Sequence, residues 1–131
     1  MTGWDSAELA SIGDADELTV QVARADGTVR KPVPVWVVRD GDDLYIRSYK
    51  GESAGWYRAV VTAHAAHVHS GGVSKDVTFD ERGRHIGQDD LALNDRIDEA
   101  YRTKYQKYGS RLTDPMITPV ARATTLKLVP R

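Results

Sequence analysis

The sequence predicts an α+β fold, a small barrel of about six antiparallel strands with three flanking helices. Several segments alternate apolar and polar residues and are rich in valine, threonine and aromatic residues, which is typical of strands. Asp40-Gly41 and Gly71-Gly72 each separate two such segments, and tight turns of this kind join antiparallel neighbours. From about Leu91 to Lys107 the apolar residues instead have the spacing of a long helix.

Composition predicts one globular domain that spans residues 1–131, with ordinary fractions of hydrophobic (40%) and charged (28%) residues. The 18 lysines and arginines against 19 aspartates and glutamates give a net charge of −1, which argues against nucleic-acid or membrane binding through overall charge. The absence of cysteine excludes disulfides and thiolate chemistry. No apolar run is long enough to span a membrane and no signal-peptide pattern opens the sequence, so we expect a cytoplasmic protein.

In the first half of the chain, Asp5 and Glu8 predict a capped short helix that Gly13 ends. The predicted elements that follow are a strand over Leu18–Ala23, a strand that carries Pro32 and Pro34 and runs through Val38, a strand over Leu44–Tyr49 and a helix over Ser53–Ala63. Proline has no N–H to donate to a neighbouring strand. The edge near Pro32 is therefore predicted to be unpaired, or to face a ligand.

The second half is predicted to contain a hairpin, a loop, the long helix and a last strand. Their bounds are His64–Ser70 with Val73–Phe79 for the hairpin, Asp80–Asp89 for the loop and Ala123–Val129 for the strand. The long helix should be capped by Asp89 or Asp90 and should end at Gly109. Its apolar face would consist of Leu93, Ile97, Tyr101, Tyr105 and Tyr108.

An anion site is predicted between Arg30 and Arg58. Ser48, Lys50 and Gly51 lead to Ser53, which we expect to cap the following helix. The unpaired N–H groups and positive dipole of a helix start favour an anion there. Because the positive charge is local on a nearly neutral chain, it suits a small anionic ligand better than a polyanion.

The whole chain resembles the domain of unknown function 2255 family. The resemblance rests on the segments WDSAELASIG, KPVPVWVVRDGDDLYIRS, SAGWYR, SGGVSKDVTF, AYRTKY and ARATTLKLVPR. At the level of fold, that family is similar to split β-barrels that bind flavin mononucleotide or a deazaflavin, among them pyridoxamine-phosphate-oxidase-like proteins and deazaflavin-dependent nitroreductases. The resemblance therefore implies a six-stranded antiparallel split β-barrel.

The deazaflavin group has a basic residue and a proline on one strand, then a Ser-Lys-Gly-type turn and a Trp-Tyr helix start. Arg30 with Pro32 resembles the first part, and Trp56-Tyr57 resembles the last. The asparagine that often follows Trp-Tyr is replaced by Arg58, and the glycine-rich approach is reduced to Gly27. These differences leave the identity of the cofactor open.

From this resemblance and the predicted anion site, we expect binding of flavin mononucleotide or a deazaflavin for a redox step. The expected cofactor-binding residues are Arg30, Lys31, Pro32, Arg47, Ser48, Lys50, Gly51, Ser53, Trp56 and Tyr57. Ser48, Lys50 and Ser53 would hold the phosphate. Arg30 and Arg47 would add positive charge, and Trp56 with Tyr57 would border the ring. No catalytic residue is assigned. The alternative is a non-enzymatic ligand-binding or dimeric interaction module that has lost the cofactor.

His64, His67 and His69 form a metal-like cluster in which His67 and His69 share a strand face, but no glutamate or aspartate lies near enough in the sequence to be a third ligand, so we predict no metal site. No nucleophile-elbow motif indicates a hydrolase, and no DNA-binding motif is present. We expect a homodimer, because Tyr45 and Tyr49 lie on the strand face opposite the barrel interior and need a cover.

Overall fold

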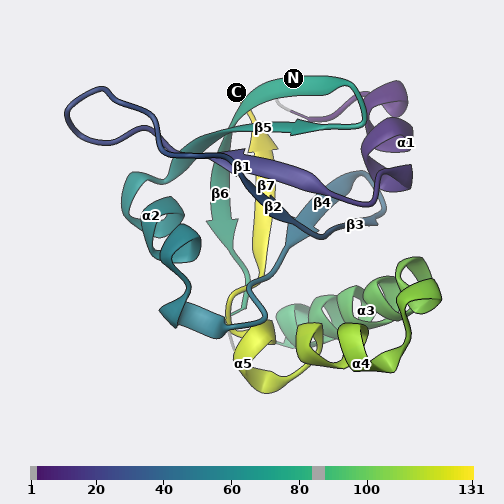
Figure 1. Ribbon diagram of the computed structural model, residues 1–131. Helices are drawn as coiled ribbons and strands as arrows, with labels where there is room; N and C mark the ends of the chain where they lie inside the picture. Colours follow the sequence, from purple (N-terminus) through teal and green to yellow (C-terminus); the bar gives the residue numbers. More distant parts are fainter. Residues whose placement is uncertain (1–2, 84–87) are drawn as a thin grey trace.

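A computed structural model describes residues 3–83 and 88–131, which form a nearly closed barrel of seven antiparallel strands with helices around it (Figure 1). The strands are β1 (Leu18–Gln21), β2 (Val33–Val35), β3 (Val37–Asp40), β4 (Asp43–Ile46), β5 (Ala65–Ser70), β6 (Val73–Glu81) and β7 (Leu126–Pro130). The α-helices are α1 (Ser6–Asp14), α2 (Gly55–Ala63), α3 (Gln88–Lys104), α4 (Ser110–Thr113) and α5 (Pro119–Arg122). The short 3₁₀ helices are η1 (Gly51–Ser53), η2 (Gln106–Tyr108) and η3 (Asp114–Met116). None of the helices in these ranges is long and apolar enough to cross a membrane.

The second predicted strand is divided in two, which accounts for seven strands instead of six. The strand order is β2-β1-β5-β6-β7-β4-β3, so β2 and β3 lie at the two ends of the sheet. The chain passes directly from one to the other through Trp36. The sheet therefore curls until its two edges meet at this residue. Pro34 lies in β2 opposite Thr19 of β1, and the prediction that the prolines mark an edge strand is confirmed.

Both predicted hairpins are confirmed. Asp40 pairs with Asp43 across the first turn, and Ser70 pairs with Val73 across the second. In the second turn Gly71 has φ 57°, and a side chain there would also meet the carbonyl of Ser11 at 2.4 Å, so only glycine fits. Strand β6 continues to Glu81, so the predicted loop over Asp80–Asp89 is shorter than expected. Its residues 84–87 lie outside the described residues.

The N-terminal helix has the predicted capping box, in which Asp5 accepts from the N–H of Glu8 and Glu8 accepts from the N–H of Asp5. The long helix begins earlier than predicted, at Gln88, so a cap at Asp89 or Asp90 is wrong because both residues lie inside α3. The last strand begins at Leu126, three residues later than predicted, because Ala123 is the C-cap residue of α5. Thr118 caps α5, and Pro119 occupies its first turn.

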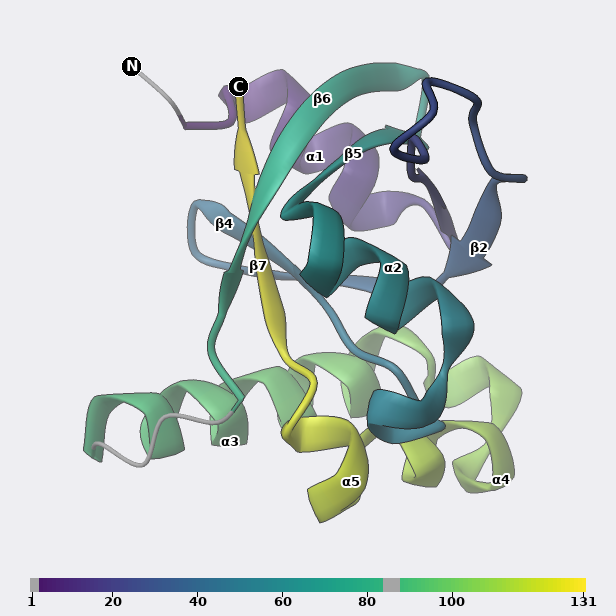
Figure 2. The ribbon, with the colours of Figure 1, turned by 90° about the vertical axis from the view of Figure 1, so that its left-hand side faces the viewer.

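Two apolar cores hold these elements together. The barrel interior contains side chains from every strand, together with α1 and α2: Leu9, Ile12, Leu18, Val20, Val35, Val37, Leu44, Ile46, Tyr57, Val60, Val68, Val77, Leu126 and Leu128. The second core lies between the outer face of β3–β4 and α3, and consists of Val38, Tyr45, Leu93, Ile97, Tyr101, Tyr105 and Met116. Figure 2 shows α3 running across one end of the barrel.

The second core corrects the argument for a partner subunit at Tyr45. Val38 and Tyr45 are paired on the outer face of β3–β4, and Tyr45 is only 4% exposed because α3 of the same chain covers it. The expectation that another subunit covers Tyr45 is therefore wrong. Tyr49, in contrast, is 58% exposed.

Candidate functional site

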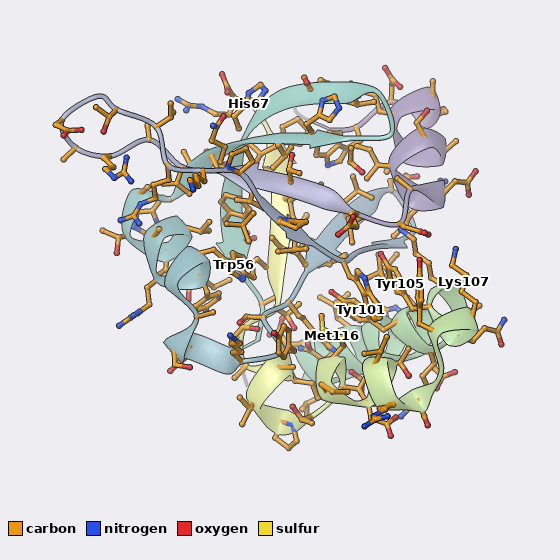
Figure 3. The ribbon with its side chains drawn as sticks, in the orientation of Figure 1. Trp56, His67, Tyr101, Tyr105, Lys107 and Met116 are labelled. Carbon is orange, nitrogen blue, oxygen red and sulfur yellow. The ribbon has the colours of Figure 1, made fainter. Side chains whose placement is uncertain are left out.

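The predicted anion site opens into a pocket of about 640 Å³. Four parts of the chain form its walls: β2 with the bend at Trp36, the segment that follows β4, the start of α2, and the segment that contains α4 and η3. Trp56 on α2 and Met116 on η3 come from different walls (Figure 3). The lining side chains are mainly apolar: Val33, Pro34, Val35, Trp36, Ala54, Trp56, Leu112, Pro115 and Met116. The polar or charged ones are Glu17, Arg47, Ser48, Tyr49 and Lys50.

Ser48 contributes a hydroxyl group that is buried and unpaired. The residue is 2% exposed, and its backbone N–H donates to Thr124 Oγ1 at 2.8 Å. Its own Oγ has no hydrogen-bond partner within the described part of the chain. A buried hydroxyl without a partner costs about 1–3 kcal/mol, so a polar group that enters the pocket would recover this energy.

The start of α2 is a second polar feature of the pocket. Ala54 is the N-cap residue and makes no side-chain capping hydrogen bond, while Gly55 and Trp56 in the first turn line the pocket. The prediction that Ser53 caps this helix is wrong, because η1 intervenes and Ser53 Oγ donates to the carbonyl of Lys50 at 3.0 Å. Within the described residues, the first N–H groups of α2 therefore have no side-chain acceptor, which favours a bound anion.

Lys50 immediately precedes η1, and Gly51 is the first residue of η1. The Lys50 ammonium lies 5.8 Å from the centroid of the Tyr49 ring and forms no ion pair with any acid in the described ranges. Gly51 has φ 71°, and a Cβ there would lie 2.4 Å from Val120 Cγ1. Gly51 thus lets the backbone pass close to α5, and it does not line the pocket.

Arg47 lies in the pocket wall, but its guanidinium is already fully hydrogen-bonded. The residue is 1% exposed, and burial lowers its pKa from the ordinary value. Its five hydrogen bonds go to Thr125 Oγ1 (2.8 Å), Asp98 Oδ1 (2.5 Å), the Met116 carbonyl (3.0 Å) and both the carbonyl and Oδ1 of Asn94 (3.2 and 2.9 Å). Because a guanidinium has five N–H donors, a direct bond from Arg47 to a ligand would require one of these to break.

The aromatic residues divide between the pocket and the core. Trp36 lines the pocket and stacks on Tyr105, with ring centroids 3.9 Å apart and an angle of 2° between the planes. Trp56 also lines the pocket and meets the ring of Tyr57 edge-on at 6.0 Å. Tyr57 itself lies in the barrel core, where burial raises its pKa to about 12. It does not line the pocket.

The pocket therefore brings together four of the ten predicted site residues, namely Arg47, Ser48, Lys50 and Trp56. Arg30 lies in a separate hollow with Arg58, and Lys31 and Pro32 line neither space. The pocket wall formed by Leu112, Pro115 and Met116 was not predicted from the sequence. No periodic pattern marks that segment, whereas Trp36 could have been inferred from its place beside the edge prolines.

The three histidines that are close together in the sequence lie in different surroundings in the structure. His64 ends α2 with φ 61°, while His67 Nδ1 lies 2.9 Å from Asp76 Oδ1 and His69 Nδ1 lies 2.7 Å from Ser74 Oγ. Asp76 reaches His67 through the register of the β5–β6 hairpin. Among the residues that the structure describes, no group of three or more histidine, aspartate or glutamate side chains is arranged to hold a metal ion.

A protein-family model described as an uncharacterized protein conserved in bacteria, DUF2255, matches residues 8–128. The chain belongs to the DUF2255 family. This confirms the resemblance inferred from the sequence. A search of curated proteins gave no significant match.

Solved structures share the fold of this DUF2255 chain. An FAD-binding protein from Mesorhizobium loti is 14% identical with a TM-score of 0.53, and the match covers 98% of this chain and 91% of that one. An FAD and heme binding protein from Mycobacterium smegmatis is 19% identical with a TM-score of 0.51, over 95% and 65% of the two chains. A protein described as F420 reductase is 18% identical with a TM-score of 0.48, over 98% and 94%. At these identities the first two structures support the barrel fold only.

Proposed function

We propose that the pocket binds an anionic heteroaromatic cofactor of the flavin type, flavin mononucleotide or a deazaflavin, for a redox step. The observation that carries this proposal is the Ser48 hydroxyl, which is buried and has no partner within the described residues, in a mainly apolar pocket beside the start of α2, which has no side-chain cap. The fold is shared with solved structures described as FAD-binding, which gives the proposal further support.

The phosphate end of the ligand would lie against the start of α2. Ser48 offers a hydroxyl, Lys50 offers an ammonium without an acidic partner in the described ranges, and α2 offers N–H groups at Gly55 and Trp56. These donors come from one short segment of chain and all surround the same space. A hydroxyl, a cation and helix-start N–H groups are the donor types that phosphate prefers.

The ring end of the ligand would lie among the apolar walls. Trp36 and Trp56 present aromatic surfaces, and Leu112 and Met116 complete an apolar lining. The stack with Tyr105 holds the Trp36 ring in place. A volume of about 640 Å³ lies within the usual range of about 300–1,000 Å³ for cofactor and ligand sites.

A bound flavin or deazaflavin would supply the hydride chemistry. The role of the chain would be to hold the phosphate through Ser48 and Lys50, orient the ring against Trp36, and exclude water with the apolar walls. Among the described residues that line the pocket there is no histidine, and the sequence has no cysteine, so the described lining offers no acyl-transfer nucleophile with a histidine base.

We further propose that the protein forms a homodimer that covers the pocket mouth. Tyr49 and Leu112 line the pocket and are 58% and 52% exposed, which leaves apolar surface at its entrance. Replacement Tyr49→Glu should then produce monomers, whereas a wild type that sediments as a monomer at tens of micromolar would contradict the dimer.

The proposed function is tested by absorption spectra of the purified protein and by calorimetric titration with flavin mononucleotide and with a deazaflavin. Wild type should bind at least one of them at a single site, and Lys50→Ala should weaken binding tenfold or more, about 1.4 kcal/mol. Lys31→Ala is the matched control, because Lys31 is also exposed but lines neither the pocket nor the hollow beside α2. A folded wild type that binds no flavin and no deazaflavin would overturn the proposal, and binding without turnover would favour the non-enzymatic alternative.

A further inference from the structure

A second hollow, of about 740 Å³, lies on the other side of the start of α2. It is formed by α2 and by the segment that follows β1, which Figure 1 shows projecting from the barrel beside α2. Its apolar lining residues are small and include Val22, Ala59 and Ala63. Its charged residues are Arg24, Arg30 and Arg58, and no acidic residue lines it among residues 3–83 and 88–131 whose side chains are described.

Within the described part of the chain, two of these arginines have guanidinium groups without a partner. Arg24 donates to Thr28 Oγ1 at 3.3 Å and to the Val29 carbonyl at 3.2 Å. Arg30 and Arg58 are exposed, and neither forms an ion pair or a side-chain hydrogen bond with any other residue of the described ranges. Other arginines of the chain, including Arg47 and Arg122, are paired with acids. A guanidinium group that has no ion-pair partner in the described residues can bind a phosphate or a carboxylate through two parallel hydrogen bonds.

The two spaces meet at one residue. Gly55, the first residue of α2, lines both the pocket and the hollow, and it has no side chain to separate them. Space is also open at this position, since a Cβ added to Gly55 would meet no atom within 4 Å. A ligand whose phosphate lies at the start of α2 can therefore continue past Gly55 toward Arg30 and Arg58.

We infer that the cofactor carries a second oxyanion group beyond its first phosphate, and that Arg30 and Arg58 bind this group. This inference rests on the proposed function of the pocket. A second oxyanion group is present in a flavin dinucleotide and in a deazaflavin with an acidic tail. Flavin mononucleotide ends at its single phosphate and would leave the hollow empty, so we expect it to bind more weakly than the extended ligands. The second phosphate of a dinucleotide and the carboxylates of a γ-glutamyl tail have the same chemistry toward arginine.

The test compares ligands that have related tricyclic rings but differ in length. Flavin mononucleotide, flavin adenine dinucleotide and a deazaflavin with a γ-glutamyl tail are each titrated into wild type and into the double variant Arg30→Gln/Arg58→Gln. The variant should bind at least one extended ligand tenfold or more weakly while its affinity for flavin mononucleotide, if measurable, stays within twofold. Loss with the dinucleotide alone would assign the hollow to a phosphate, and loss with the deazaflavin alone would assign it to carboxylates.

Two further variants separate charge from folding. Arg58→Lys keeps the charge without the bidentate geometry and should lose less affinity than Arg58→Gln. Arg102→Gln removes an exposed arginine of α3, outside both spaces, and should bind all ligands as wild type does. Equal losses for short and extended ligands, or no loss for any, would overturn the inference while the proposed function stands. A wild type that binds none of the three would overturn both.

Discussion

The guanidinium of Arg47 and the carboxylate of Asp98 form an ion pair in the interior, with Nη1 and Oδ1 2.5 Å apart. Asp98 also accepts from Arg122 at 2.6 Å, so this one carboxylate of α3 links the residue that follows β4 to α5. Arg47 is the residue directly before Ser48. The pair therefore holds the strand end that carries the unpaired hydroxyl of the pocket.

Replacement Asp98→Asn should destabilise the protein by about 3–5 kcal/mol, because it leaves the buried Arg47 charge without its counter-charge. Urea unfolding monitored by circular dichroism measures the loss. Asp95→Asn is the control, since Asp95 is exposed and bonds only to Arg122 among the contacts described, and it should cost less than about 1 kcal/mol. Similar losses for the two variants would show that the buried pair is not a major source of stability.

Replacement Ser48→Ala should leave stability unchanged or raise it by up to about 1 kcal/mol, because it removes a buried hydroxyl that has no partner. Flavin affinity should nevertheless fall tenfold or more, about 1.4 kcal/mol. Thr124→Val is the contrasting variant. The Thr124 hydroxyl accepts from Ser48 N–H and donates to the Ala121 carbonyl at 2.7 Å, so its loss should cost about 1–3 kcal/mol. Marked destabilisation by Ser48→Ala would indicate a structural role for the hydroxyl.

Replacement Gly51→Ala should cost more than Gly72→Ala, although both glycines have positive φ (71° and 83°). Each substitution strains the backbone by about 1–2 kcal/mol. Only the alanine at Gly51 would also collide with the Val120 side chain, which should add about 1–3 kcal/mol. Chemical denaturation of both variants tests the difference. The double variant Gly51→Ala/Val120→Ala should recover the steric part, and a failure to recover would refute the proposed collision.

Lys104 should make stability depend on pH. Its ammonium donates to the Val37 carbonyl at 2.7 Å, and burial lowers its pKa from 10.5 to about 8. Between pH 8 and 10.5 the unfolded chain therefore binds the proton that the folded chain has released, so the contribution of Lys104 to stability rises with pH over this range and is lost as pH falls through 8.

Urea unfolding of wild type and Lys104→Met, measured from pH 7 to 10, tests this contribution. Stability of the wild type should rise relative to the variant as pH increases. The buried tyrosines act in the opposite direction at higher pH: burial raises the pKa of Tyr45 and Tyr57 to about 12, so their contribution is lost between pH 10 and 12. Parallel pH curves for wild type and variant would contradict the lowered pKa of Lys104.

Local signals in the sequence predicted the barrel well. The Asp-Gly and Gly-Gly turns, the alternating strands and the Asp5 capping box each depend on residues close together in the chain. Ser53 failed as a cap because a 3₁₀ turn can use the same residues, and the local sequence does not distinguish the two.

The polar network around Arg47 could not be derived in the same way. Asp98 is 51 residues away in sequence from Arg47, so only the packing of α3 against β4 brings the pair together. One signal was present: Asn94 and Asp98 are four residues apart, beside the apolar face that includes Ile97 and Tyr101. Two polar residues at this spacing next to a buried face indicate a buried partner, without naming it.

The proposed function depends most directly on flavin binding inside the pocket, and two exposed leucines allow this binding to be tested. Leu112 lines the pocket and is 52% exposed, whereas Leu91 on α3 is 54% exposed and lies outside it. The ligand that wild type binds most tightly is titrated into Leu112→Glu and Leu91→Glu. We predict that Leu112→Glu weakens binding tenfold or more, about 1.4 kcal/mol, because a carboxylate at the entrance repels an anion, while Leu91→Glu binds as wild type does. Equal affinities in the two variants would contradict binding in this pocket.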